Sequence, residues 1–281
     1  MTASSAPGTL YVVATPIGNL DEISPRAVRI LGKVECIACE DTRHTRKLLS
    51  HLGISTPLTS YYREKETQKS EVLLKQLQQG KSLALVSDAG TPGISDPGAI
   101  LIKAARKTGI AIVPISGPCA LTVALSVAGL TDSRFFFAGF PPAKQKARQD
   151  FFRELASLSW PLFFYESPHR IKRFLADALE VFGNRQAMLF RELTKLHEEV
   201  RDGTLEELLS LCEGKNRGEF VVMVQGADQS GQERPEDVDE LLRWHRDRGD
   251  SLKESVREIS ETLGIGRSKI YQRALALWQE R

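Results

Sequence analysis

The chain has 281 residues, of which 41% are hydrophobic and 26% are charged, and its formal net charge is +2. This length suits two domains and a small third one, and the composition is that of an ordinary globular protein. No apolar run is long enough to span a bilayer, and the N-terminus lacks the features of a signal peptide. We therefore expect a cytoplasmic protein with no membrane partner, in which residues 1–8 form a disordered tail.

The cysteines favour neither a metal site nor a disulfide framework. Cys36 and Cys39 lie three residues apart in a stretch typical of a strand, so their side chains are expected on opposite faces. A structural zinc site would need a second such pair, which the chain lacks. We expect small buried cysteines in a reducing cytoplasm, and no metal.

The first half of the chain alternates short apolar runs with helical patterns that begin near proline and end near glycine. Expected strands cover residues 9–14, 34–40, 82–87 and 111–115. Expected helices cover residues 25–32, 42–52, 67–79 and 97–109, and another begins at 116–118 and ends near 129. This alternation predicts parallel α/β layers in an N-terminal domain over residues 9–117.

The second half is less regular. Expected strands cover residues 135–138, 160–165, 186–191, 197–201 and 219–225, with helices over 144–158, 168–183 and 204–212. Strands with so little helix between them predict antiparallel pairs in a mixed sheet, in a second α/β domain over residues 118–227. A polar linker at 228–237 then leads to a helical domain at 238–281 with helix-turn-helix spacing.

The loop over residues 88–93 is the strongest candidate for a binding site. It is rich in glycine and follows the apolar run at 82–87, with Asp96 and Pro97 expected to open the next helix. Ligands of open α/β sheets bind at the carboxyl ends of the strands, and glycine lets the backbone approach them closely. Asp88 would add a carboxylate to this crevice, although the loop could also be a plain turn.

Three further polar groups follow expected strands, at residues 40–43, 165–170 and 191–195. Each alone is explained by capping or surface pairing, but together with the loop at 88–93 they favour a common site. Dinucleotide-binding, P-loop, serine-nucleophile and zinc motifs are absent from the sequence.

Basic residues form stretches at 43–47, 144–153 and 169–173 and in the last helix pair, which carries Arg267, Lys269 and Arg273. On one face they would follow a nucleic-acid backbone, and otherwise they are solvated helix faces. The helix pair itself is either a phosphate-binding element or a small helical cap or dimer element.

With these residues assembled, the chain resembles the methyltransferases of the tetrapyrrole-methylase fold, and among them the group that acts on small-subunit ribosomal RNA. The motifs run in family order from Thr9 to Gly226, and Glu22 departs from the usual Asp in the first of them. They are YVVATPIGNLDEIS, CEDTRHTRKLL, LVSDAGTPGISDPG, ISGPCA, FAGFPP, YESPHRI, RELTK with the following EE, and GEFVVMVQG.

The resemblance implies a two-domain tetrapyrrole-methylase-like fold, a homodimer, and S-adenosylmethionine held between the two domains. It implies 2′-O-methylation of a cytidine ribose in the decoding region of 16S ribosomal RNA, on the RNA or the small ribosomal subunit. The donor would be held largely by the main chain. The implied donor-binding residues are Pro16, Ile17, Asp88, Ala89, Gly90, Thr91, Pro92, Ser116 and Gly117, with Tyr165 and Leu193 as weaker matches.

A ribose hydroxyl is a poor nucleophile at neutral pH, so a general base would help the transfer. Glu166 and His169 are the first candidates because they follow a strand, and Glu192 is the next. Capping of the helix after Pro168 is the alternative role of the first two. The expected phosphate contacts are Arg43, Arg46, Lys47, Lys144, Lys146, Arg148, Arg170, Lys195, Arg267, Lys269 and Arg273.

Two other functions stay open. A methyltransferase of tetrapyrrole precursors shares the fold, but such relatives usually carry a G-x-G-P-G first turn where this chain has Ala14–Gly18. A non-enzymatic helix-turn-helix regulator with a ligand-sensing α/β body is the second alternative.

Overall fold

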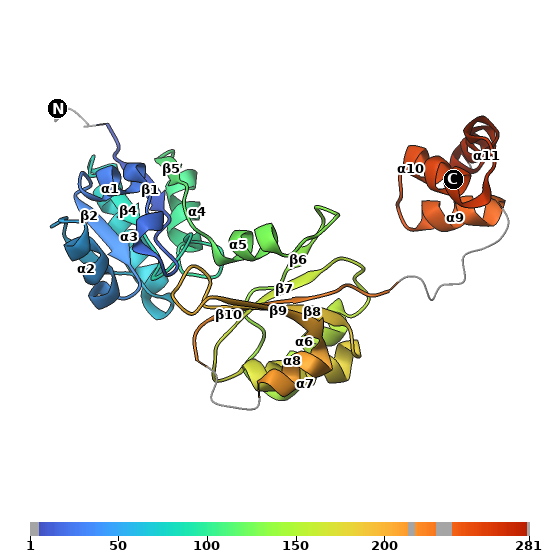
Figure 1. Cartoon of the computed structure of the whole chain (residues 1–281). Coiled ribbons are helices and arrows are strands. Elements are labelled where there is room, and N and C mark those ends of the chain that lie inside the picture. The colour runs from blue at the N-terminus through green and yellow to red at the C-terminus, as the bar shows by residue number, and fades with distance from the viewer. Residues whose placement is uncertain (1–5, 213–216, 229–237, 280–281) are drawn as a thin grey trace. The chain divides into compact units, whose positions relative to one another are not determined.

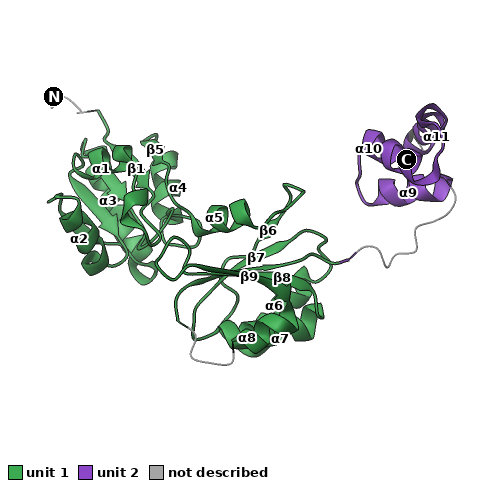
Figure 2. Cartoon of the chain, viewed as in Figure 1, with its two compact units in different colours: residues 1–227 green, residues 228–281 purple. Residues whose placement is uncertain are grey.

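The structure is a computed structural model that describes residues 6–212, 217–228 and 238–279. The chain divides into two compact units, Met1–Ala227 and Asp228–Arg281 (Figure 2). Most of the expected tail and linker, residues 1–5 and 229–237, lie outside the described residues. Gly8, expected in the tail, is instead buried, and its N–H donates to the carbonyl of Leu77 at 2.8 Å.

The first sheet is parallel throughout, as the sequence predicts, with strand order β3-β2-β4-β1-β5. Its strands are β1 (Thr9–Val13), β2 (Cys36–Cys39), β3 (Leu58–Ser60), β4 (Leu83–Leu85) and β5 (Ala111–Ile115). Strand β3 was not expected, because three residues are too short for a periodic signal. This strand forms only because β2 offers it a parallel edge.

Helices cover both faces of this sheet (Figure 1). They are α1 (Pro25–Leu31), α2 (Thr42–His51), α3 (Glu66–Gln78) and α4 (Ala99–Lys107), with 3₁₀ turns η1 (Leu20–Glu22) and η2 (Arg63–Lys65). Leu77 of α3 and Leu101 of α4 pack with Leu83 in one apolar cluster. Leu31 of α1 and Leu49 of α2 pack in another, on the opposite face. Both faces are therefore buried, which suits a parallel sheet.

The second sheet is mixed, with strand order β6-β7-β10-β8-β9. Only β6 and β7 are parallel, and the other pairs are antiparallel. Its strands are β6 (Phe136–Phe137), β7 (Leu162–Glu166), β8 (Gln186–Arg191), β9 (Glu199–Thr204) and β10 (Phe220–Val224). The strand expected at 197–201 lies two to three residues later, because its register is set by pairing with β8.

One face of the second sheet carries three helices, and the other carries α5 (Figure 1). The helices are α5 (Ala120–Val127), α6 (Gln145–Leu155), α7 (Ile171–Phe182) and α8 (Leu205–Leu211). Phe152, Phe164 and Phe174 form edge-to-face pairs in the core under α6 and α7. On the other face, Leu121 and Ala124 of α5 pack with Phe163.

The expected caps of two helices are wrong. Helix α4 begins at Ala99, with Gly98 rather than Asp96 as the N-cap residue. The carboxylate of Glu66 on α3 accepts the N–H groups of Gly98 and Ile100 at 2.9 and 3.2 Å, so a residue distant in sequence satisfies this helix start. Helix α7 begins at Ile171 rather than at residue 168, so Ser167 and Pro168, the pair predicted to cap it, belong to the turn before it.

The C-terminal unit consists of α9 (Val238–Asp247), α10 (Leu252–Leu263) and α11 (Arg267–Gln279) in the described residues. Leu242, Ile259 and Ile270, one from each helix, are almost completely buried in a core of their own. Gly264 ends α10 in the left-handed conformation, and α11 begins three residues later. The expected pair of helices joined by a short turn is confirmed.

Candidate active site

The carboxyl ends of β1 and β4 meet in one crevice, as expected for ligand sites of parallel sheets. The loop after each strand pairs with the other, since Thr15 and Gly90 exchange N–H to carbonyl hydrogen bonds of 2.9 and 3.0 Å. The Thr15 hydroxyl also donates to the carbonyl of Ser87. The loop at 88–93 is therefore held at its middle by the neighbouring strand.

Gly90 shows why this loop needs glycine. Its φ is +78°, a left-handed conformation that L side chains rarely adopt. A Cβ at this position would lie 3.2 Å from Cγ2 of Ile17. At Gly90 the loop consequently presents only main-chain atoms to the space between the two domains.

A cavity of about 410 Å³ lies between this loop and the second sheet. Its size falls in the range of about 300–1,000 Å³ that is typical of small-ligand sites. Eight of the predicted site residues line it, namely Ile17, Asp88, Ala89, Gly90, Thr91, Tyr165, Glu166 and Leu193. The loop of the first domain and the strand ends of the second therefore share one site.

Six of the predicted donor-binding and general-base residues do not line the cavity. Pro16, Pro92, Ser116, Gly117, His169 and Glu192 are absent from its wall. Pro16 and Pro92 are buried beside lining residues, whereas Ser116, Gly117 and His169 are exposed. Gly117 instead permits close packing, since a Cβ there would lie 2.9 Å from that of Ala14.

A second group of lining residues was not expected from the sequence. They are Ile94, Ser95, Asp96, Cys119, Ala120, Phe140, Ser167, Pro168, Phe190, Glu219, Phe220 and Val221. Asp96 and Phe140 lie in quoted motifs and could have been found there. Phe190 lies outside the quoted motifs and Val221 lies within one, but both are ordinary strand residues in sequence, and the sheet topology brings them to the site.

The first-domain side of the site is acidic. Asp88 and Asp96 line the cavity, and Asp88 accepts the N–H of Asp41 at 2.9 Å. Burial raises the pKa of Asp96 and of Glu40 at the end of β2, and a hydrogen bond with Ser87 opposes the shift at Asp96. The charge of Asp88 contributes to both shifts, and Arg63 opposes them. This edge of the cavity favours a ligand that carries positive charge.

Tyr165 links strand β7 to helix α5 within the second domain. Its hydroxyl oxygen accepts the N–H of Leu121 at 3.0 Å, in the first turn of that helix. Phe137 and Phe140 pack edge-to-face against its ring. Burial raises the pKa of Tyr165, so the hydroxyl stays protonated at neutral pH. Tyr165 therefore fixes the start of α5 against β7 at the wall of the cavity.

Glu166 and Arg170 form an ion pair at the end of β7. Oε2 of Glu166 lies 3.1 Å from Nη2 of Arg170, and Oε1 accepts the N–H of Ser167 at 2.7 Å. The Glu166 side chain has no exposed surface, although the residue belongs to the cavity wall. Burial raises its pKa, and the Ser167 N–H and the Arg170 charge oppose that shift.

The turn at residues 192–195 connects the two domains. Two residues in it adopt a positive φ without being glycine, Glu192 at +50° and Thr194 at +68°. Oε1 of Glu192 accepts hydrogen bonds from Nζ of Lys195 at 2.7 Å and from the N–H of Glu219 at 3.0 Å. Burial alone would raise the pKa of Glu192, but these hydrogen bonds lower it. The hydroxyl of Thr194 accepts the N–H of Asn19.

Arg148 is not available to an external phosphate. It is almost fully buried on α6, where its guanidinium pairs with Asp177 of α7 and donates to the carbonyls of Pro142 and Ala143. The expectation that Arg148 contacts RNA is therefore wrong. The 3.6-residue period puts this arginine on the inner face of α6 with Phe152, whereas Lys144 and Lys146 are exposed.

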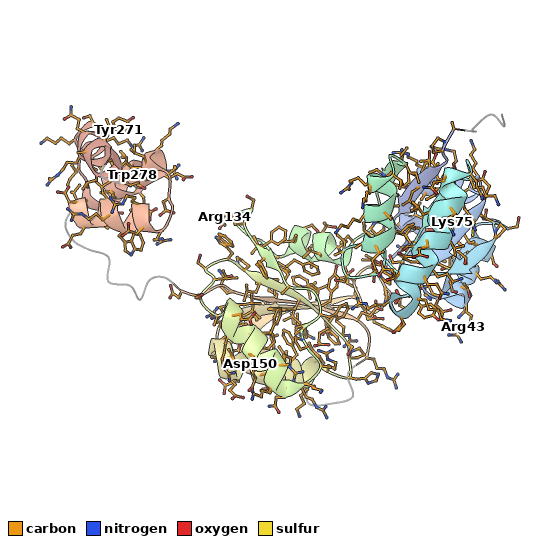
Figure 3. The ribbon with its side chains drawn as sticks, turned by 180° about the vertical axis from the view of Figure 1, so that it is seen from behind. Arg43, Lys75, Arg134, Asp150, Tyr271 and Trp278 are labelled. Carbon is orange, nitrogen blue, oxygen red and sulfur yellow. The ribbon has the colours of Figure 1, made fainter. Side chains whose placement is uncertain are left out.

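The other basic residues lie where phosphates could reach them. Arg46 and Lys47 on α2 are exposed, and Arg43 pairs with Asp41 while its side chain is 89% exposed. Hydrogen bonds from Arg43 lower the pKa of Asp41 to about 2. Lys195 is partly covered because it is paired with Glu192 and Glu219. Figure 3 shows Arg43 at the margin of the first domain.

Cys36 and Cys39 are free thiols whose pKa is raised by burial. Within residues 6–212, 217–228 and 238–279, His, Cys, Asp and Glu side chains form no group that could hold a metal ion. No helix in the described part of the chain has the length and hydropathy to cross a membrane.

Comparison with known proteins supports the family resemblance. The family model of the tetrapyrrole (corrin/porphyrin) methylases matches residues 9–209. The ribosomal RNA small subunit methyltransferase I of Xylella fastidiosa (strain Temecula1) is 52% identical over 227 residues, covering 79% of this chain and 83% of that protein. The protein of the same name from Pseudomonas aeruginosa is 44% identical over 278 residues, covering 95% and 97%.

Solved structures show the same fold at low identity. Diphthine synthase superposes with a TM-score of 0.61 at 15% identity, covering 78% of this chain and 90% of that one. Uroporphyrin-III C-methyltransferase from Thermus thermophilus, solved with S-adenosylhomocysteine, gives a TM-score of 0.55 at 15% identity over 77% and 97%. The chain therefore belongs to the tetrapyrrole (corrin/porphyrin) methylase family, in the group of the ribosomal RNA small subunit methyltransferase I proteins.

Proposed function

We propose that the protein transfers a methyl group from S-adenosylmethionine to the 2′-hydroxyl of a cytidine ribose in the decoding region of 16S ribosomal RNA. The single observation that carries this proposal is the shared cavity, whose walls combine the bare loop at 88–93 with the strand ends of the second domain. The names of the relatives support ribosomal RNA of the small subunit as the acceptor.

The residues of the cavity fit S-adenosylmethionine. The donor carries a positive sulfonium and an ammonium group, and the carboxylates of Asp88 and Asp96 line the same cavity. The left-handed Gly90 leaves room where a Cβ would meet Ile17. When bound, the donor supplies an activated methyl group, so the protein's main task is alignment of the acceptor.

Glu166 is the base candidate that the geometry supports best, because it alone of the three candidates belongs to the cavity wall. Its raised pKa makes this carboxylate a stronger base than an ordinary glutamate. A rotation away from Arg170 would expose its carboxylate, and hydrogen bonds of catalytic groups often rearrange once substrate binds. Glu192 would serve instead to hold the turn at 192–195, and His169 to contact RNA.

The acceptor RNA would be held by exposed basic residues. We propose Arg43, Arg46 and Lys47 on α2, with Lys144 and Lys146 at the start of α6, as phosphate contacts of the first unit. Arg170 and Lys195 are already paired with carboxylates, so each would contact a phosphate only by exchanging its partner.

The decisive experiment uses tritiated S-adenosylmethionine with small ribosomal subunits, and separately naked 16S RNA, from cells that lack the enzyme. Nuclease mapping should locate the label on one 2′-O-methylcytidine, and the better substrate would show when in assembly the enzyme acts. Donor binding without label on either RNA would contradict the proposed acceptor. It would favour a tetrapyrrole precursor, which the same reaction with tritiated donor can test.

A homodimer would explain an apolar surface on the second domain. Phe135 and Phe136 lie at β6, Val127 ends α5 and Trp160 precedes β7, and all four are exposed by 37–52%. Isolated exposed apolar residues are common, but a group of them marks interaction surfaces. Analytical ultracentrifugation of the wild type and of Phe136→Glu should give a dimer and a monomer, respectively, and a wild-type monomer would contradict this part of the proposal.

A further inference from the structure

The C-terminal unit contains a groove that the sequence did not indicate. It lies between α10 and α11 and has a volume of about 690 Å³. Its lining residues are Lys253, Glu254, Val256, Arg257, Arg267, Ser268, Tyr271 and Gln272. Three cations, one carboxylate and an aromatic ring therefore face one concave surface.

The positive charge of this groove is available to a ligand. Lys253 and Arg257 lie one turn apart on α10, both are exposed, and neither makes a salt bridge within the described residues. Arg267 pairs with Glu261 at 3.0 Å, but both side chains are 63% exposed. Exposed pairs of this kind are weak, so a phosphate can replace the carboxylate.

Tyr271 adds a stacking surface. It is 46% exposed and lies one turn after Arg267 on α11 (Figure 3). The three-helix core is complete without it, because Ile270, Ala274 and Leu277 supply the buried face of α11. An exposed aromatic ring beside several cations is the arrangement on which single-stranded nucleic acids bind, by base stacking and phosphate pairing.

Lys269 and Arg273 do not contribute to this surface. Neither lines the groove, and Arg273 pairs with Asp239 of α9 at 2.8 Å. The basic residues that the sequence groups together on α11 thus divide between two faces. Arg267 alone of the three belongs to the groove, and its neighbours there come from α10.

From these contacts we propose that the α10–α11 groove binds a single-stranded segment of the RNA substrate. Lys253, Arg257 and Arg267 pair with its phosphates, and Tyr271 stacks on one base. This assignment rests on the proposed function, since it adds a second RNA-binding site to a ribosomal RNA methyltransferase. The groove positions the substrate and takes no part in methyl transfer.

The test compares full-length variants on small ribosomal subunits from cells that lack the enzyme. Lys253→Gln with Arg257→Gln should raise KM about tenfold while kcat at saturating subunits is unchanged. For binding of a short single-stranded RNA, the plot of log affinity against log salt concentration should be less steep than that of the wild type. Its slope should be smaller in magnitude by about 1.4, because two phosphate contacts disappear. The matched control, Lys103→Gln with Lys107→Gln on α4, removes the same charge elsewhere and should change neither quantity.

Substitution of Tyr271 tests the contribution of base stacking separately from the contribution of charge. Tyr271→Ala should weaken RNA binding about 5- to 100-fold with an unchanged salt slope, and Tyr271→Phe should retain wild-type affinity. Equal KM in the wild type, the double Gln variant and Tyr271→Ala would overturn the groove proposal while leaving the proposed function intact. A wild type that methylates no ribosomal RNA would instead overturn the proposed function.

Discussion

Gly90 is the residue at which the proposed donor site is most sensitive to an added side chain. Its φ is positive, and a Cβ added at this position would lie only 3.2 Å from the side chain of Ile17. Gly93 in the same loop has a φ of +84°, but a Cβ added there would meet nothing within 4 Å. The two glycines therefore share the backbone requirement and differ in the space around them.

We predict that Gly90→Ala lowers the affinity for S-adenosylmethionine more than Gly93→Ala does. Both substitutions carry the strain of a positive φ, of order 1 kcal/mol, but only the first pushes Ile17 towards the cavity. Isothermal titration calorimetry with the donor measures the difference. Equal affinities in the two variants would show that the loop does not approach the donor closely.

The ion pair of Glu166 and Arg170 leads to a prediction about how the reaction rate depends on pH. A general base works only when deprotonated, so the rate falls as pH drops through its pKa, which burial raises above the usual glutamate value. Arg170→Gln removes a cation that lowers this pKa. The acidic limb of single-turnover rate against pH should therefore move to higher pH.

Arg173→Gln on the same helix is the control, since Arg173 is exposed and should leave the pH profile unchanged. Glu166→Gln should slow single turnover about 10²- to 10⁴-fold if Glu166 is the base. Wild-type rates in both Glu166→Gln and His169→Ala would show that neither of these two residues is the general base.

At the scale of elements, the buried pair of Arg148 and Asp177 fastens α6 to α7. Asp177 also accepts hydrogen bonds from the amides of Gln145 and Gln149, so its carboxylate is surrounded by donors. This network lies beneath Pro142 and Ala143, which precede α6. The basic stretch at 144–153 consequently contains exposed basic residues and one buried arginine that stabilises the packing of α6 on α7.

We predict that Arg148→Ala destabilises the protein by about 3–5 kcal/mol, because Asp177 would keep a buried charge without its partner. Arg153→Ala should cost no more than about 1 kcal/mol, since its pair with Asp150 is more than half exposed. Urea denaturation gives both values. If Arg148→Ala instead raised KM for ribosomal subunits and left the stability unchanged, Arg148 would have to contact RNA, contrary to what the structure indicates.

At the scale of the whole molecule, every residue of the cavity lies between Ile17 and Val221, inside the first compact unit. The C-terminal unit has its own core and its own groove. The proposed donor site therefore lies in the first unit, and the proposed groove for single-stranded RNA lies in the C-terminal unit.

A chain that ends at Ala227 should keep its affinity for S-adenosylmethionine within about twofold. Its KM for small subunits should rise about tenfold or more, because the phosphate contacts of the C-terminal unit are lost. Calorimetry and steady-state methylation measure the two effects. Loss of donor binding in the truncated chain would favour a regulator whose parts act only together.

Several features of the site follow from local patterns, because they depend on neighbours in sequence. A strand followed by glycines indicates the loop at 88–93, and a polar group after an apolar run indicates Tyr165 and Glu166. The helix start at Ala99 could not be predicted in this way, because Glu66 accepts the backbone N–H groups there through a tertiary contact. The start at Ile171 differs from the expectation for a local reason, since a turn at Ser167 precedes the helix.

Motifs and hydrophobic period are local properties, and from them the sequence alone predicts the family, the parallel first sheet, the mixed second sheet and the central loop. Only the folded chain reveals that Phe190 and Val221 join the cavity, that Arg148 is buried, and that Lys253 and Arg257 face Tyr271. The physical reason is that strand order, the orientation of each helix and the pairing of charges depend on contacts between residues distant in the chain.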